Sequence, residues 1–180
     1  LDLHEDLREG LDVGSSGGDQ EMIVEEAGPA DDRRLAVRPA REDGTPGAPH
    51  QYLNFPILEE ALGPNSTQLT PIAICVTYYD DPALIDAEFR PEVYRTDRNG
   101  VETFGFTPES AYVQIEGTDT WRTAYWEIPD VRFTGVNQGP QAAARFQLSD
   151  KIFFTRVRYA ALRSCGPNAG VNLLEECKPP

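Results

Sequence analysis

The segment Gly117-Thr-Asp-Thr-Trp-Arg-Thr-Ala-Tyr-Trp-Glu-Ile-Pro-Asp-Val-Arg-Phe133 decides the fold class of this chain. A polar turn leads into an extended run whose two faces differ, with Ala124, Trp126 and Ile128 on one side and Tyr125 and Glu127 on the other. Alternation with a period of two is typical of a strand that buries one face. The segment therefore predicts an antiparallel β-sandwich.

Similar runs flank this segment on both sides. The predicted strands are residues 11–13, 21–25, 51–58, 71–79, 87–94, 102–106, 110–116, 121–128, 143–148 and 151–162. Turn residues separate them, and Asn99-Gly100 is a strong hairpin signal between flanking strands. Many short strands with short connections and no long helix indicate an all-β sandwich or barrel.

A chain of 180 residues suits one domain. We expect three parts: a polar arm with the first short strands at 1–34, the β-sandwich core at 35–163, and a tail at 164–180 that two cysteines bracket. No apolar run approaches the roughly 20 residues that span a bilayer. The formal net charge of -14 repels phosphate backbones and anionic lipid, which argues against nucleic-acid and membrane-surface partners.

The three cysteines occur in two different contexts. Cys75 lies in the strand-like run 71–79, where a free cysteine behaves as a small hydrophobe. Cys165 and Cys177 bracket the tail, and no CxxC pair or histidine cluster accompanies them. We predict a Cys165–Cys177 disulfide, an unpaired Cys75, and a secreted or extracellular protein, because disulfides persist in oxidising compartments.

The segment 117–133, the pair Asn137-Gln138 and the final run 151–158 together resemble the galactose-binding-like jelly-roll modules of bacterial carbohydrate-active enzymes. The resemblance covers about residues 51–162. It implies a jelly-roll-like sandwich that binds carbohydrate without catalysis. One departure concerns the last strands, where such modules often carry Ala-Asp-Phe-Arg and this chain has Ala-Arg145-Phe-Gln147.

A carbohydrate ligand would stack on exposed aromatic rings and bond to loop amides. Trp126 shares a face with Ala124 and Ile128, so we expect it in the core. Tyr79 and Tyr125 are the exposed candidates for stacking, although a tyrosine at the rim also packs against a neighbouring strand. The amides of Asn137 and Gln138 are candidates for reading sugar hydroxyls, or for satisfying their own loop.

The resemblance also implies a structural calcium between the first and last strands. Asp19 and Glu21 near the first strand, with Asp150 before the last, are the candidate ligands. The alternative is that they are ordinary acidic residues of turns, since no EF-hand spacing supports them.

The sequence does not predict an enzyme. No GxSxG motif occurs, and His4 and His50 lie in polar or Pro-rich segments. We therefore expect a non-catalytic extracellular carbohydrate-binding module. The alternative is a structural subunit of an extracellular assembly, in which the terminal arms contact neighbouring subunits.

Overall fold

The computed structural model describes residues 2, 22–39, 51–55, 70–96, 102–105, 109–131 and 144–161. Ten strands form in these ranges, and every pairing between them is antiparallel. Within them, no helix is long and apolar enough to cross a membrane.

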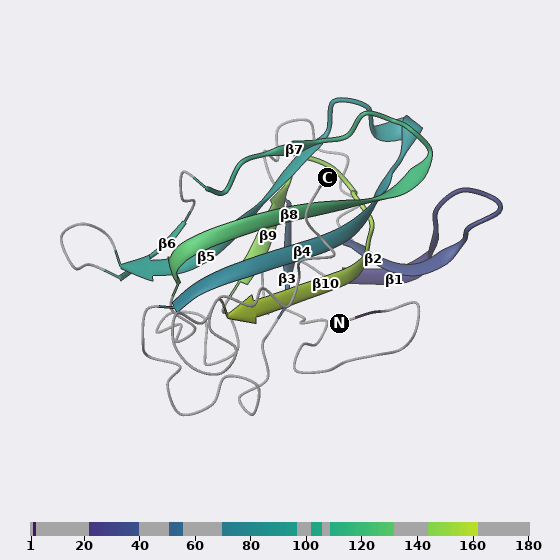
Figure 1. Cartoon of the computed structure of the whole chain (residues 1–180). Coiled ribbons are helices and arrows are strands. Elements are labelled where there is room, and N and C mark those ends of the chain that lie inside the picture. Colours follow the sequence, from purple (N-terminus) through teal and green to yellow (C-terminus); the bar gives the residue numbers. More distant parts are fainter. Residues whose placement is uncertain are drawn as a thin grey trace.

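The front sheet has the order β1-β2-β10-β4-β8. Its strands are β1 (Met22–Ala27), β2 (Arg34–Pro39), β10 (Phe154–Ala161), β4 (Thr70–Asp80) and β8 (Thr120–Val131). Figure 1 shows β8, β4 and β10 side by side, with the β1–β2 hairpin extending from one end.

The back sheet has the order β5-β9-β3, with β6 and β7 paired to β5. Its strands are β5 (Glu88–Thr96), β9 (Ala144–Leu148), β3 (Gln51–Asn54), β6 (Glu102–Gly105) and β7 (Val113–Gln114). The two sheets meet at one edge, where Arg95 of β5 pairs with Val131 of β8.

The strand order is that of a jelly roll. The chain changes sheet at each connection except β1–β2 and the run β5–β6–β7. Without β1, the front sheet reads β2-β10-β4-β8 and the back sheet reads β3-β9-β5 followed by β6 or β7. Eight strands divided between two four-stranded sheets in this order form a double Greek key, which is the jelly-roll topology. The predicted antiparallel jelly-roll-like sandwich is confirmed.

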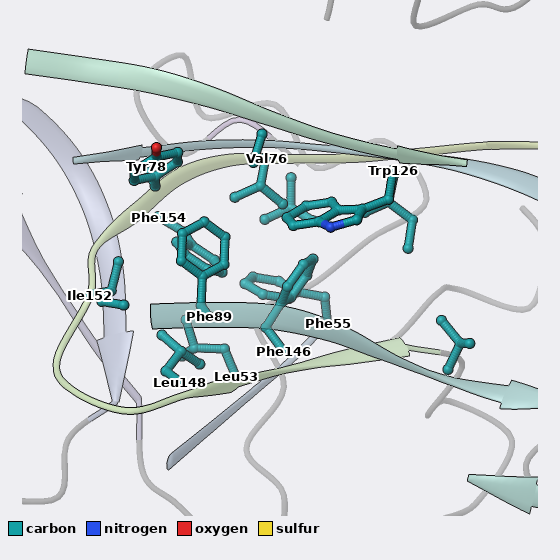
Figure 2. Close-up of a cluster of buried hydrophobic side chains, with 14 of the residues drawn as sticks. Leu53, Phe55, Val76, Tyr78, Phe89, Trp126, Phe146, Leu148, Ile152 and Phe154 are labelled. Carbon is teal, nitrogen blue, oxygen red and sulfur yellow. The ribbon is translucent and has the colours of Figure 1, made fainter. Parts of the chain in front are cut away.

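The core lies between the sheets and is rich in aromatic rings. Figure 2 shows Phe89 and Phe146 of the back sheet facing Trp126 and Phe154 of the front sheet. The Phe89 ring centroid lies 5.0 Å from that of Phe154 and 5.9 Å from that of Trp126. The predicted alternation in β8 is confirmed, because Ala124, Trp126 and Ile128 are all buried.

Most predicted strands exist, with two differences. Residues 110–116 contain only the two-residue strand β7, and β2 was not predicted. The Asn-Gly hairpin is confirmed by the pairing of Thr96 with Glu102 on either side of it. The predicted strand at 11–13 lies outside the described residues. β1 pairs with β2 and is therefore part of the front sheet. The boundary predicted at residue 34 falls inside this hairpin.

The turn between β1 and β2 requires glycine at position 28. Gly28 has a φ of +104°, and a Cβ there would lie 2.6 Å from Nε1 of Trp121 and 2.7 Å from the Asp32 carbonyl oxygen. The same indole Nε1 donates to that carbonyl at 2.9 Å. A side chain at position 28 would therefore displace the contact that joins this turn to the start of β8.

Candidate functional site

The outer face of the back sheet carries a polar and aromatic cluster. Alternation explains its position: Phe89 and Val93 of β5, Phe146 and Leu148 of β9, and Leu53 of β3 all point into the core. Their neighbours along the strands point outward. These neighbours, with a tyrosine from the segment before β7, form what we call the outer-face cluster: Tyr52, Arg90, Glu92, Tyr112, Arg145 and Gln147.

One row of the cluster is an ion pair that stacks on a tyrosine. Glu92 and Arg145 are directly paired across β5 and β9, and Nε of Arg145 donates to Oε2 of Glu92. Both side chains are largely buried. The Arg145 guanidinium also lies 4.0 Å from the ring centroid of Tyr52. A cation–π contact of this kind restrains the guanidinium over the ring.

The second row is centred on the amide of Gln147, which is 5% exposed. Its Oε1 accepts from Nε of Arg90 at 3.2 Å and from the Tyr112 hydroxyl at 3.3 Å. Its Nε2 donates to the Tyr52 hydroxyl at 3.4 Å. The Arg90 guanidinium lies 4.1 Å from the ring centroid of Tyr112. One buried amide therefore connects both tyrosines and one arginine.

This arrangement suits binding rather than bond cleavage. Guanidinium and amide groups offer planar, directional hydrogen bonds, and Tyr112 is a large ring that is 42% exposed. The cluster contains a single carboxylate, that of Glu92, which is bound to Arg145. Glycoside hydrolysis requires two carboxylates that face each other across the scissile bond, and this cluster does not provide them.

A second group of polar contacts, at one end of the sandwich, fixes the chain before β8. Asp80 is fully buried, and its Oδ1 accepts from the backbone N–H groups of Glu116 at 2.7 Å and Gly117 at 3.0 Å. Its Oδ2 accepts from the Thr118 hydroxyl at 2.5 Å and backbone N–H at 3.1 Å. Burial alone would raise the pKa of Asp80, but these donors lower it to about 2. The carboxylate is thus a structural anion.

Tyr79, predicted to be exposed, is 9% exposed and precedes Asp80 in β4. Its hydroxyl donates to Oδ1 of Asp119 at 2.5 Å, and its ring centroid lies 5.6 Å from that of Trp121. Burial and the bond to Asp119 raise the pKa of Tyr79 to about 12. The prediction of exposure is wrong, because the ring packs against Trp121 at the end of the sandwich.

Tyr125 lies on the outer face of the front sheet, where it packs against Ala73, Cys75 and Ala160. Its hydroxyl donates to Oε1 of Glu127 at 2.6 Å. It is partly buried, and the structure places Tyr79 and Tyr125 in different surroundings. Asn137 and Gln138 lie outside the described residues, so a ligand role for any of these four residues stays a prediction.

The calcium prediction concerns Asp19, Glu21 and Asp150, of which only Asp150 is described. It is exposed in the loop after β9, and its Oδ1 accepts from the backbone N–H of Lys151 at 2.7 Å. Among the described residues, no group of three or more histidine, cysteine or acidic side chains is placed to hold a metal ion. Calcium binding therefore stays a prediction.

Cys75 is disulfide-bonded, so the prediction that it is unpaired is wrong. Its side chain is 2% exposed on the outer face of β4. Cys165 and Cys177 lie outside the described residues. Because the chain has three cysteines, a bond from Cys75 to either of them within one molecule excludes the predicted Cys165–Cys177 bridge.

We expect peptide mapping without reduction to recover Cys75 in a disulfide-linked peptide. The linked peptide should contain Cys165 or Cys177, and the remaining cysteine should react with an alkylating reagent. Mapping after reduction is the control, since all three cysteines should then be alkylated. Alkylation of Cys75 in the unreduced, denatured protein would contradict the bond.

Sequence reasoning missed the outer-face cluster as a site. In the sequence, Arg145 and Gln147 stand out only as a departure from the resembled modules. A signal for it lies in β5, where apolar and charged residues alternate in Phe89-Arg90-Pro91-Glu92. The two charged residues, one base and one acid, fall on the same face. In the sheet, Arg90 pairs with Gln147 and Glu92 pairs with Arg145. Each of the two residues that differ from the resembled modules therefore has a polar partner of complementary chemistry on β5.

Comparisons with known proteins give one structural match to describe. No protein-family model and no curated protein matches the chain. The CBM22-1 xylan-binding domain from Paenibacillus barcinonensis Xyn10C aligns over 91% of this chain and 93% of that domain, with 11% sequence identity and a TM-score of 0.49. We draw no inference about a ligand from a match at this level.

Proposed function

We propose that this chain is a non-catalytic carbohydrate-binding module and that its ligand contacts the outer-face cluster. The observation that carries the proposal is the exposed Tyr112 ring beside the hydrogen-bonded row of Arg90, Gln147 and Tyr52. Sugars present apolar C–H faces and hydroxyl edges, so they need a ring beside directional donors and acceptors. Strands β5, β9 and β3 hold Arg90, Gln147 and Tyr52 in place before the ligand arrives, which reduces the entropy cost of binding.

The disulfide of Cys75 supports a secreted or extracellular location, since disulfides are rare in reducing compartments.

The alternative function, assembly through the terminal arms, has less support. Asp2, the one described residue before Met22, forms a bridge with Arg156 of its own chain, and its Oδ2 lies 3.1 Å from Nε of that arginine.

We expect wild-type protein to be retarded in native gels that contain a polysaccharide it binds, and Tyr112→Ala to lose most of this retardation. Loss of one stacking ring should weaken binding on the order of tenfold, because a few central aromatic contacts carry much of the energy of an interface. The panel should include cellulose derivatives, xylans, mannans, β-glucans and pectins, and titration calorimetry should follow on the best ligand.

Ile85→Ala is the matched control, since Ile85 is also an exposed apolar residue but lies in the loop after β4, outside the cluster. It should bind as wild type does. Both variants should keep the wild-type circular dichroism spectrum. If Tyr112→Ala is retarded as strongly as wild type, the ligand does not contact the outer-face cluster through Tyr112. If wild type is retarded by no polysaccharide of the panel, carbohydrate binding is refuted.

A further inference from the structure

The orientation of the Gln147 amide follows from its neighbours. The Nε–H of arginine is a donor only, so the amide atom that faces Arg90 must be the acceptor Oε1. The amide nitrogen is then directed at the Tyr52 hydroxyl. Arginine therefore fixes an orientation that an isolated glutamine would leave open.

This orientation fixes the polarity of the Tyr112 hydroxyl. Since Oε1 of Gln147 only accepts, the hydroxyl must donate its proton toward the sheet, over 3.3 Å. That distance is long for an O–H···O bond. It is consistent with an acceptor, Oε1 of Gln147, that also accepts from Arg90. With its proton directed inward, the exposed side of the Tyr112 hydroxyl presents lone pairs.

We propose that Gln147 is a positioning residue for the ligand, which acts through Tyr112. It holds the Tyr112 hydroxyl as an acceptor, so that the cluster takes a ligand hydroxyl that donates a hydrogen bond at this point. This inference rests on the proposed function and adds the hydrogen-bond polarity that the site requires of its sugar. Gln147 is almost fully buried, so its contribution to binding is indirect.

A double-mutant cycle on the best polysaccharide or its oligosaccharide tests the inference. Tyr112→Phe removes the acceptor and keeps the ring, and Gln147→Met removes the amide at nearly constant length. Each should weaken binding about fivefold, the effect of one hydrogen bond. Because Gln147 is proposed to act only through the Tyr112 hydroxyl, which Tyr112→Phe already removes, the double variant should also bind about fivefold more weakly than wild type, and not about 25-fold.

Gln147→Glu is the conservative rescue. Its carboxylate accepts from both Arg90 and Tyr112, so affinity should stay within about twofold of wild type. Gln114→Met is the control, since Gln114 is exposed on β7 and bonds to Asp86 at 3.3 Å outside the cluster. Dissociation constants are to be measured on protein whose folded fraction is checked by thermal unfolding.

The outcomes separate the two proposals. Wild-type binding with multiplicative effects of Tyr112→Phe and Gln147→Met, or with no effect of Gln147→Met, overturns the positioning role and leaves carbohydrate binding in place. No wild-type binding to any polysaccharide overturns both.

Discussion

Phe89→Ala is expected to lower the free energy of unfolding by about 3–5 kcal/mol, the usual effect of truncating a buried phenylalanine. Phe89 is fully buried between the two sheets. Its ring centroid lies 4.9 Å from that of Tyr78 and 5.0 Å from that of Phe154, so the loss would open a cavity lined by other rings. These two rings belong to different strands, β4 and β10, and cannot both move to fill it. Urea unfolding followed by tryptophan fluorescence measures the change.

Two controls define what the result means. Phe89→Leu keeps most of the volume and should lose no more than about 1.5 kcal/mol. Ile85→Ala removes an apolar side chain that is 58% exposed and should stay within about 0.5 kcal/mol of wild type. A loss below about 1 kcal/mol for Phe89→Ala would mean that the two sheets do not enclose this ring.

The sequence predicts the sandwich well because burial on one face imposes a local, period-two pattern. The run 124–128 shows it, since Ala124, Trp126 and Ile128 face the core as predicted. Strand β2 escaped prediction because Leu35, Ala36 and Val37 follow one another without alternation. In the structure, Ala36 and Val37 are both buried while Leu35 is exposed. Contacts on both faces of this strand remove the pattern.

The site was harder to predict because its residues come from four segments of the chain. Tyr52, Arg90, Tyr112 and Gln147 become neighbours only through the pairing of β3, β9 and β5 and the segment before β7. The sequence predicts an exposed Tyr79, but tertiary packing against Trp121 buries it. Exposure of a tyrosine at a strand end depends on the neighbouring loop, which periodicity does not report.

Asp80→Ala is expected to cost about 3–5 kcal/mol at neutral pH, as breaking a buried charge network does. The carboxylate accepts from the backbone N–H groups of residues 116–118, and the substitution would leave these partly buried groups without this acceptor. Arg122, whose Nη1 lies 3.3 Å from Oδ2 of Asp80, would keep only its bond to Glu116 at 2.6 Å among these partners. Thermal and urea unfolding measure the loss. Asp31→Asn, on an exposed turn, controls for removing one negative charge.

The charge of Asp80 also predicts how stability depends on pH. Its pKa is lowered from 3.8 to about 2 on folding, which corresponds to about 2 kcal/mol of stabilisation. Because the folded pKa is the lower one, this stabilisation is complete well above pH 3.8 and is lost as pH falls toward 2. Asp80→Asn has no charge to titrate at this position, so the stability difference between wild type and Asp80→Asn should be constant from about pH 5 to 7 and should shrink by about 2 kcal/mol in acid. Urea titrations of both proteins at each pH give the difference directly. A difference that stays constant down to pH 2 would show that the carboxylate stabilises the loop through its shape and hydrogen bonds alone, without its charge.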